Sequence, residues 1–345
     1  MITFHAPGQP CARLSTSEQC AELTRTAVWI DLLEPTPAEE QTLEAALGID
    51  IPTREEMQAI ELSSRLYEEE GRLFMTATVL TRSDTAHPES SAVTFILTGD
   101  KLVTLRYADP AAFHSFHTRR EANLQRYQTN YQFLGGLIDA IIERVADILE
   151  GVGTKLDIIS QRVFEPEHSP GSVGFYRNLK SSARGRARKA RQRNHVEVLR
   201  LIGAASDLIS RARESLVSFN RLVAFFREVR KDNEASGTRE SLAHWKTVAA
   251  DLGSLSDHAS FLSAKVSFLL DATLGMINNE QNAIIKILSV AALVFLPPTL
   301  VAGVYGMNFH FMPELDWVHG YPMALLIMII SAVLPYLVFR HRGWL

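Results

Sequence analysis

The chain has 345 residues, of which 46% are apolar and 21% charged, and its formal net charge at pH 7 is −4. This composition is close to the globular average, so the length allows two or three ordinary domains and the net charge indicates no partner by itself. Cys11 and Cys20 are the only cysteines, which excludes a metal site of the Cys-x-x-Cys type and indicates two reduced thiols.

Residues 1–110 carry the patterns of a small α/β domain. The stretches "AVWIDLL" and "RLFMTATVLTR" predict strands, and "SAVTFILTGDKLVTLRY" predicts a hairpin that turns at Gly99-Asp100. Between the two strands, "TPAEEQTLEAALG" predicts a capped amphipathic helix that closes on Gly48. The N-terminus lacks a basic start followed by an apolar core, so we expect no secretory signal and a cytosolic location for this domain.

Residues 111–240 show helical periodicity, which predicts a cytosolic helical region. Turn-like sequences interrupt it at 165–174 and near 231–240. The basic insert 177–193, "RNLKSSARGRARKARQR", contains eight Lys or Arg and no acid. Because it has no interleaved aromatic residues, it does not indicate nucleic-acid binding, and we expect a solvated loop or helix face. Lipid contact depends on whether this tip reaches a membrane.

Two apolar runs near the C-terminus, 287–304 and 321–339, each approach the ~20 residues that a helix needs to cross a bilayer, and neither contains a charged side chain. Since a buried helix of a globular protein usually keeps a polar face, they predict a membrane hairpin. The gap 305–320 contains no Lys or Arg, whereas Lys286 precedes the first run and the basic tail 340–345 follows the second. The positive-inside rule therefore predicts a multi-pass protein of the cytoplasmic (inner) membrane, with both termini in the cytosol and the gap on the periplasmic side.

A single stalk and pore helix is predicted over 241–304, because no proline occurs between residue 241 and Pro297. Positions spaced by four and three along it are mostly small or polar: Asp271, Gly275, Asn278, Asn282, Ile285, Ser289, Ala292, Leu296, Thr299 and Gly303. Amides and carboxylates near a membrane are costly unless they face one another or water, so this stripe favours a central aqueous path over simple helix packing. One chain with two spans cannot enclose such a path, which predicts an assembly of identical subunits.

The residue types along the predicted path indicate a cation. The stripe contains no Lys, Arg or His, Asp271 lies at its cytosolic end, and Glu314 and Asp316 give the outer loop an acidic field. Neutral oxygens are offered by the backbone and by Asn282, Thr299 and Asn308. Mg²⁺ keeps several waters when it is bound, so a ring of amides that hydrogen-bonds to those waters suits the hydrated ion. Calcium or transition metals normally need more carboxylate, nitrogen or sulfur ligands.

The tripeptide Gly306-Met307-Asn308 closes the first apolar run, and "MPEL" follows it before the second run. Together with "EQNAIIKILSVAALVFLPPTLVAGVYGMNFHFMPELDWVHGYP" and the terminal "RHRGWL", this pattern resembles the CorA family of divalent-cation channels along the whole membrane portion. The upstream "VWIDLLEP" is similar to the N-terminal domain of the same family, so the resemblance extends more loosely along the rest of the chain.

That resemblance implies a homopentamer with a funnel-shaped cytosolic part of α+β fold and long helices, followed by two transmembrane helices of which the first lines the pore. Gly306, Met307 and Asn308 would form the outer selectivity filter, and Asn308 would bind the metal through its hydration water. The positions that match the family's pore-facing residues are Asn282, Ile285, Leu288, Leu296 and Thr299. The three aliphatic members would gate by dewetting, and Asp271 would form an acidic ring near the cytosolic mouth. Leu288 lies one residue from Ser289 of the stripe, and the sequence leaves open which of the two faces the axis.

Regulation is implied by the resemblance alone. The family closes when cytosolic Mg²⁺ occupies carboxylate sites between neighbouring subunits, but no motif locates those sites here. The basic insert 177–193 also stands where the family often carries an acidic stretch. His310 has two interpretations, a surface histidine or a residue that favours Co²⁺, Ni²⁺ or Zn²⁺ at the mouth.

Three functions are alternatives at this stage. The first is influx of Mg²⁺, with Co²⁺ and Ni²⁺ also admitted, down the electrochemical gradient until high cytosolic Mg²⁺ closes the path. The second is a Zn²⁺ transporter of the same superfamily, which the intact Met307 and "MPEL" disfavour, and the third is a non-conducting membrane-anchored helical scaffold. An enzyme is not expected, because the sequence lacks a nucleophile–base pair, a Gly-rich phosphate loop and His-Glu-x-x-His. We expect no cofactor beyond the transported and regulatory Mg²⁺, and as partners further copies of the chain, lipid and divalent cations.

Overall fold

The computed structural model describes the chain except for residues 15–16, 60, 86, 165–180, 233–238, 308–311, 313–316, 318 and 343–345. For residues 17–18, 62, 181–194, 231–232 and 239–242 it describes the helical backbone alone. The chain divides into two compact units, Met1–Leu270 and Asp271–Leu345, and the division falls inside the long helix α9 (Arg239–Tyr305). The predicted boundaries at 110 and 240 lie beside the first residues of α5 (Ala111–Ala122) and α9.

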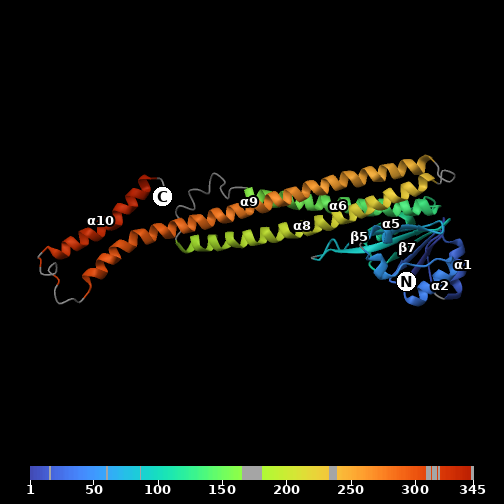
Figure 1. Cartoon of the computed structure of the whole chain (residues 1–345), viewed down its shortest axis with the longest axis horizontal. Coiled ribbons are helices and arrows are strands. Elements are labelled where there is room, and N and C mark those ends of the chain that lie inside the picture. The colour runs from blue at the N-terminus through green and yellow to red at the C-terminus, as the bar shows by residue number, and fades with distance from the viewer. Residues whose placement is uncertain are drawn as a thin grey trace. The chain divides into compact units, whose positions relative to one another are not determined.

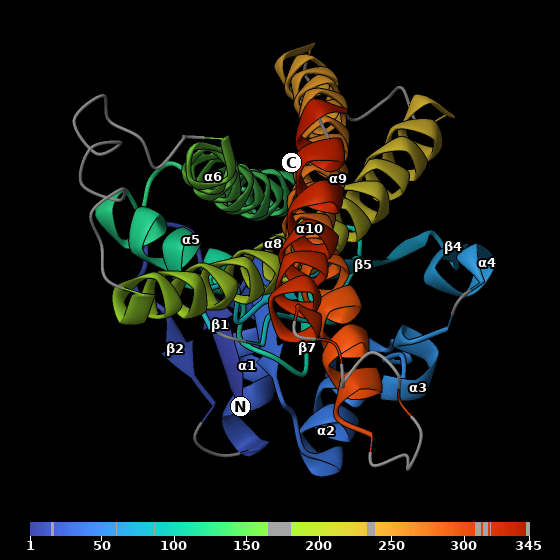
Figure 2. The same ribbon diagram turned by 90° about the vertical axis from the view of Figure 1, so that its left-hand side faces the viewer.

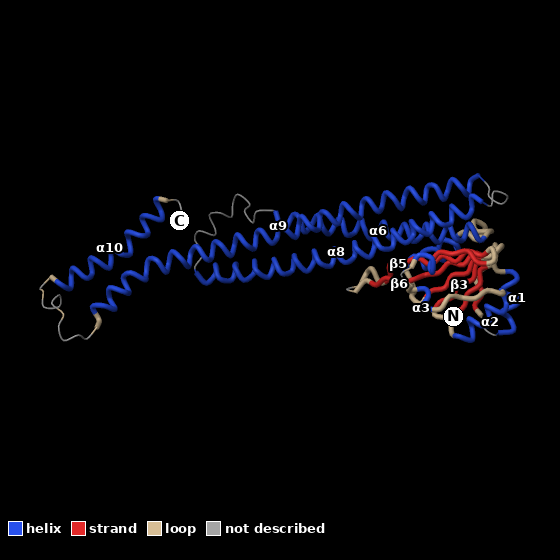
Figure 3. The backbone as a smooth tube through the Cα atoms, viewed as in Figure 1, coloured by secondary structure: helices blue, strands red, loops and turns tan. Residues whose placement is uncertain are grey.

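The first unit contains one seven-stranded sheet, drawn in red in Figure 3, with the strand order β2-β1-β3-β7-β6-β5-β4. Neighbouring strands are antiparallel except β3 and β7, which are parallel. The strands are β1 (Ile2–His5), β2 (Ala12–Arg13), β3 (Trp29–Leu33), β4 (Leu66–Glu69), β5 (Arg72–Thr81), β6 (Glu89–Leu97) and β7 (Leu102–Arg106). The two predicted strands are confirmed as β3 and β5, and the predicted hairpin as the β6–β7 pair.

The predicted capped helix is confirmed as α2 (Pro37–Leu47). The Thr36 hydroxyl accepts from the Glu39 amide, and the Glu39 carboxylate accepts from the Thr36 amide at 2.8 Å, so both N–H groups at the helix start are satisfied. At the other end Gly48 has φ 63°, which L side chains rarely adopt, and its amide donates to the Glu44 carbonyl at 2.7 Å. The other short helices of this region are α1 (Ser17–Thr26), α3 (Arg54–Met57) and α4 (Leu62–Arg65).

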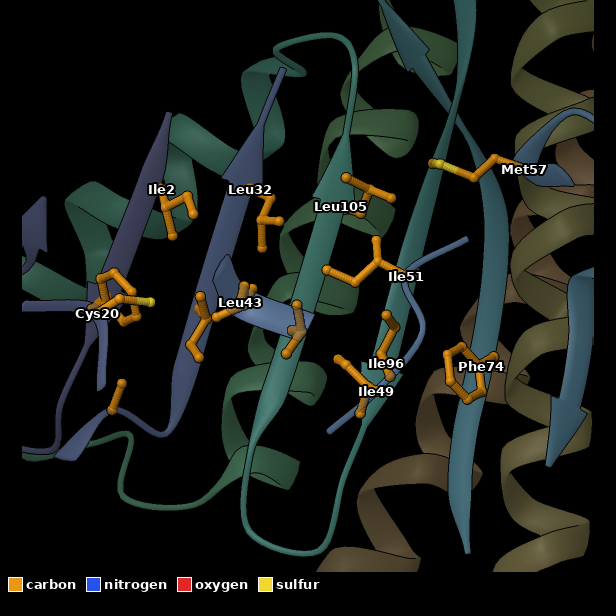
Figure 4. Close-up of a cluster of buried hydrophobic side chains, with 14 residues drawn as sticks. Ile2, Cys20, Leu32, Leu43, Ile49, Ile51, Met57, Phe74, Ile96 and Leu105 are labelled. Atoms are coloured by element: carbon orange, nitrogen blue, oxygen red, sulfur yellow. The ribbon is translucent and has the colours of Figure 1, made fainter. Parts of the chain in front are cut away.

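One face of the sheet is covered by a hydrophobic cluster that it shares with α1, α2 and α3 (Figure 4). Alternate residues of the strands belong to it, for example Ile30 and Leu32 of β3, as the two-residue period of a strand requires. Cys20 of α1 is a buried free thiol in this cluster, whereas Cys11 is a free and exposed one. The fold therefore uses Cys20 as an apolar core residue.

The opposite face is covered by α5, α6 (Asn130–Phe164) and α8 (Ser181–Asp232), as Figure 1 shows. Trp29 lies fully buried at its centre, stacked on His5 with ring centroids 4.0 Å apart and edge-on to Phe116 at 5.4 Å. Its indole N–H donates to the Thr104 hydroxyl at 3.0 Å, which satisfies the one polar atom of the ring. The first unit is thus a sheet between two helical layers.

A buried ion pair on this second face gives Asp31, the aspartate of "VWIDLLEP", a structural role. Arg106 Nη2 and Nε donate to the Asp31 carboxylate at 2.8 and 3.1 Å, and the Thr104 hydroxyl donates to it at 2.7 Å. Burial lowers the pKa of Arg106, but the charges and hydrogen bonds of Asp31 and Asp109 outweigh burial and raise it overall. Because removal of one partner of a buried pair costs about 3–5 kcal/mol, this pair holds the parallel strands β3 and β7 in register.

Within the first unit, α9 packs against α6 and α8, and in Figure 2 α6 is seen nearly end-on and the other two obliquely. Its buried residues are spaced by three, four or seven positions, as one face of a helix requires: Trp245, Val248, Leu252, Ala259, Leu262, Val266 and Leu269. Lys265 Nζ donates to Asp157 of α6 at 2.6 Å, and His244 Nε2 lies 3.5 Å from Asp139. Burial raises the pKa of Asp139, while the charge of His244 opposes that shift.

The second unit contains the remainder of α9 and α10 (Gly320–His341). Both helices are long and apolar enough to cross a membrane, and the predicted spans 287–304 and 321–339 lie inside them. The expected α+β part with long helices, followed by two apolar C-terminal helices, is therefore confirmed. Of the basic insert, residues 181–193 have helical backbone in α8, and residues 177–180 lie outside the described chain.

A glycine in α6 provides a test of this packing. A Cβ at Gly136 would meet Phe116 Cε2 at 2.5 Å and Tyr127 Cε1 at 2.6 Å, so two aromatic rings of the core would have to move. We expect Gly136→Ala to destabilise the full-length protein by about 1–3 kcal/mol in thermal unfolding in detergent.

Gly151→Ala in the same helix is the matched control. No atom lies within 4 Å of a Cβ at Gly151, so this change is expected to be neutral or to stabilise by up to about 1 kcal/mol through helix propensity. Equal melting temperatures for the two variants would contradict the close packing described at Gly136.

Candidate ion pathway

The candidate pathway is built on the C-terminal part of α9, where the packed interior of the first unit ends. All five predicted pore-facing residues lie on this helix and are exposed in the single chain: Asn282, Ile285, Leu288, Leu296 and Thr299. The bulky Ile287 and Leu300 of the neighbouring faces are exposed to a similar extent, 72% and 69%, compared with 70% for Leu288 and 73% for Leu296. Another face of the segment is half-buried, with Val290, Val294, Pro297 and Val301, so one chain covers this helix only in part and leaves the predicted pore face exposed.

The helical period separates the predicted pore positions from their neighbours. Asn282, Ile285, Leu296 and Thr299 fall on one face of α9 because they are spaced by multiples of three and four residues. Ser289 falls within that face, between Leu296 and Asn282, whereas Leu288 lies at its edge beside Thr299, and both are exposed. The packing of further copies decides which of the two faces the axis.

Prolines and a hydroxyl modify the backbone of this segment. Pro297 and Pro298 remove two amide donors from the helix interior, but α9 continues through them to Tyr305. The Thr299 hydroxyl donates to the Phe295 carbonyl at 2.6 Å, one turn back. Its oxygen keeps its acceptor capacity, so Thr299 can present a neutral oxygen to a water or a cation while its proton stays within the helix.

The outer end of α9 is closed by Gly306 and Met307. The Gly306 amide donates to the Ala302 carbonyl at 2.9 Å, and the Met307 amide donates to the Val304 carbonyl at 3.3 Å. A Cβ at Gly306 would lie 3.0 Å from the Ala302 carbonyl oxygen, which is backbone and cannot rotate away. A side chain at this position would therefore press on the last turn of the helix, two residues before Asn308.

The polar residues of α9 lie at different distances from the predicted membrane span. At about 1.5 Å per residue, Asp271 lies about 24 Å along the helix before residue 287, where the predicted span begins. Its carboxylate is exposed and lies outside the apolar segment. Asn282 lies about 7 Å before the same point, where a membrane surface would be. Thr299 is the one of these three side chains within the span.

Several predicted residues lie outside the part of the chain that the structure describes: Asn308, His310, Glu314 and Asp316. The described residues bring together no group of three or more His, Cys, Asp or Glu side chains that could hold a metal ion. The regulatory carboxylate sites that the resemblance implies are thus not assembled by the described part of one chain.

The sequence patterns missed a cluster of arginines in the first unit. Arg65, Arg213 and Arg221 line one pocket between the sheet and α8. The only signal in the sequence is the spacing of Arg213 and Arg221, which places both on one face of a helix two turns apart. Arg65 joins them from a distant segment, so the cluster becomes visible only in the fold.

Comparison with known proteins identifies the group to which the chain belongs. The profile of the family described as "CorA-like Mg²⁺ transporter protein" matches residues 25–341. The chain belongs to the CorA family. It is also 34% identical over 319 residues to the magnesium transport protein CorA of Salmonella typhimurium and to that of Escherichia coli, covering 92% of each protein and 92% of this chain.

Solved structures share the fold of this CorA-family chain at lower identity. The CorA magnesium transporter from Methanocaldococcus jannaschii superposes with a TM-score of 0.66 at 17% identity, covering 100% of this chain and 99% of that one. The full-length CmaX protein gives 0.59 at 15% identity, with coverages of 99% and 97%. The cytoplasmic domain of ZntB from Vibrio parahaemolyticus gives 0.53 at 11% identity, with coverages of 81% and 98%.

Proposed function

We propose that this protein is a membrane channel that admits Mg²⁺ down its electrochemical gradient. One observation carries the proposal: a CorA-family chain in which Gly306 and Met307 directly follow the end of α9, the first of two helices long enough to span a membrane. The relatives that are 34% identical to it are named magnesium transport proteins.

Assembly is needed for conduction, since two helices cannot surround a path. We propose a homopentamer, as the family resemblance implies, with its cytosolic parts arranged as a funnel and five copies of α9 around the axis. The exposed faces of α9 support this arrangement, because one can then face water while the others contact neighbouring copies or lipid. The backbone groups of both spans are satisfied inside their own helices, apart from those at the prolines.

Selectivity in this proposal comes from amides at the outer mouth. Five Asn308 side chains would present neutral oxygens and N–H groups to the water shell of Mg²⁺, which exchanges its waters reluctantly. Glu314 and Asp316 on the outer loop and Asp271 on the cytosolic side would raise the local cation concentration at the two ends. Ile285, Leu288 and Leu296 would form hydrophobic constrictions that close by dewetting.

Topology and regulation follow the same proposal. Lys286 and the basic tail would hold both termini in the cytosol of a cell whose inner membrane the protein spans. Cytosolic Mg²⁺ would close the path by binding carboxylates between neighbouring copies, and Co²⁺ and Ni²⁺ would be admitted beside Mg²⁺. The protein would need no cofactor and catalyse no reaction. Its partners would be its own copies, lipid and the permeant ions, with no nucleic acid among them.

A Zn²⁺ transporter is the second candidate. Its support is the shared fold with the cytoplasmic domain of ZntB, at 11% identity. His310 in the outer loop would favour it, because imidazole is a better ligand for Zn²⁺ than for Mg²⁺. A non-conducting scaffold is a weaker third candidate, since helix packing alone would account for a small-residue stripe.

The filter proposal is tested by Asn308→Ala in purified protein reconstituted into vesicles. Loss of the amide ring removes the hydrogen bonds to the hydrated ion, so the initial rate of Mg²⁺ uptake is expected to fall roughly tenfold or more. Uptake is measured with an internal Mg²⁺-sensitive dye under an inside-negative potential.

Asn279→Ala is the matched control, an exposed amide of α9 that is not part of the stripe, and it should retain uptake. If the Asn308 variant takes up Mg²⁺ as fast as the wild type, at equal amounts of protein in the vesicles, Asn308 is not part of the filter. Absence of flux in wild-type protein with no internal Mg²⁺ would instead favour the scaffold.

The close approach at Gly306 gives a second test at the same mouth. In Gly306→Ala the methyl group presses on the Ala302 carbonyl, so the backbone before Asn308 must shift. We expect Mg²⁺ uptake to fall roughly fivefold, as a distortion of about 1 kcal/mol implies. Gly253→Ala, where a Cβ meets no atom within 4 Å, should leave uptake unchanged, and equal uptake in both variants would refute the requirement for glycine.

The choice between Mg²⁺ and Zn²⁺ is made by competition. In the same vesicles, Mg²⁺ uptake should be inhibited by Co²⁺ and Ni²⁺, and Zn²⁺ should enter more slowly than Mg²⁺ at equal concentration. Faster entry of Zn²⁺, reduced by His310→Ala, would establish the second candidate in place of the first.

A further inference from the structure

A pocket of about 560 Å³ opens in the first unit between α8 and the β4–β5 side of the sheet. Its α8 wall consists of residues that recur every three or four positions and so share one helix face: Ser210, Arg213, Glu214, Val217, Ser218 and Arg221. The facing wall comes from the segment after α3, the end of α4, and β5. The volume lies within the range of small-molecule sites, about 300–1,000 Å³.

The pocket carries an excess of positive charge. Three arginines line it, Arg65, Arg213 and Arg221, whereas Glu214 is its one acid. Arg213 and Arg221 are exposed and make no ion pair within the part of the chain that the structure describes. Burial lowers the pKa of Arg65, Arg221 lowers it further, and Glu214 acts in the opposite sense without restoring it. An anion between these guanidinium groups would relieve their mutual repulsion.

Arg65 has unused hydrogen-bonding capacity. Its Nη2 donates to the Met57 carbonyl at 3.3 Å and its Nη1 to the Thr78 hydroxyl at 3.4 Å, both at the long end of the range. Its Nε is buried and has no acceptor among the described residues. A buried N–H group of a charged side chain is rarely left without a hydrogen-bond acceptor. Arg65 can therefore donate a further hydrogen bond to an oxygen atom of a ligand.

The uncharged residues that line the pocket indicate the chemistry of the uncharged part of the ligand. Five uncharged lining residues carry a hydroxyl or an amide, Thr76, Thr78, Ser210, Ser218 and Gln58. Three are aliphatic, Ala59, Leu66 and Val217, and no aromatic side chain is among the described lining residues. Such walls suit hydroxyl groups and offer no surface on which a nucleobase could stack. The Thr78 amide donates to the Ser218 hydroxyl at 2.9 Å, which joins β5 to α8 and fixes the width of the pocket.

We propose that this pocket binds a sugar phosphate, with Arg213 and Arg221 holding phosphate oxygens at the opening, Arg65 an oxygen deeper inside, and the hydroxyl-lined wall the sugar. A guanidinium group binds phosphate with two parallel N–H donors, and a single surface arginine can do this. Three arginines around one pocket favour a ligand with several charged oxygens. The bound ligand connects α8 with α4 and β5.

The test is isothermal titration calorimetry of the full-length protein in detergent and Mg²⁺-free buffer, with fructose 1,6-bisphosphate as the probe. One site per chain is expected, and the affinity should fall roughly tenfold or more in Arg213→Gln/Arg221→Gln. Both side chains are exposed, so the double variant should fold, and its melting temperature without ligand checks this. Arg200→Gln, exposed on α8 outside the pocket, is the matched control and should bind as wild type.

Three further ligands decide the chemical class. Fructose and inorganic phosphate are each expected to bind at least tenfold more weakly than the bisphosphate, because each offers one half of the interactions. Inorganic phosphate that binds as tightly would overturn the role of the sugar, and ATP that binds more tightly would overturn the exclusion of nucleotides. No heat with the bisphosphate at millimolar concentration, or equal binding in the double variant, would overturn the site. Binding is measured directly, so the result does not depend on whether the protein conducts Mg²⁺.

Discussion

Helix α9 passes from a packed protein interior into a stretch that its own chain covers on one face only, and the functional proposal depends on this change. Trp245, Leu252 and Leu269 are at most 2% exposed, whereas Leu288 and Leu296 are 70% and 73% exposed. Because burial of one aliphatic side chain contributes about 1.5–3 kcal/mol, such a surface is not left in water. Lipid and further copies of the chain are the two covers that its composition allows, and a helix that uses both has one side left for an aqueous path.

The first unit gives α9 a fixed base. Its sheet is held between two helical layers, and the buried pair of Asp31 and Arg106 secures the parallel strands at the centre. On the outer side of the second layer, Lys265 and Asp157 bind α9 to α6 shortly before the helix leaves the unit. A ligand that connected α8 with the sheet would act on the same layer.

The sequence predicted the elements whose signals are local. The capping box at Thr36 and the glycine at 48 bounded α2, and the two charge-free runs located the apolar helices because length and composition suffice for both. Strands β1 and β2 were not predicted. Ile2–His5 has only four residues, all of them buried, and its own sequence does not indicate that it pairs with β2 and β3. For the same reason the Arg65 cluster was missed. Leu288 and Ser289 stay undecided because the neighbours that would separate them belong to other copies of the chain, and Asn308 stays a sequence prediction.

The C-terminal ends of the two apolar helices, α9 and α10, differ in the charge of their side chains. The last turn of α10 contains Arg340 and His341, but the last turn of α9, which ends at Tyr305, contains no basic residue. A helix C-terminus carries roughly half a negative charge from its aligned peptide dipoles, so that of α10 is compensated and that of α9 is not. In the proposed pentamer five uncompensated helix ends would converge below the ring of Asn308. The backbone itself would then supply a negative potential at the outer mouth, fixed in place and independent of pH, where a carboxylate would bind the ion too tightly to release it.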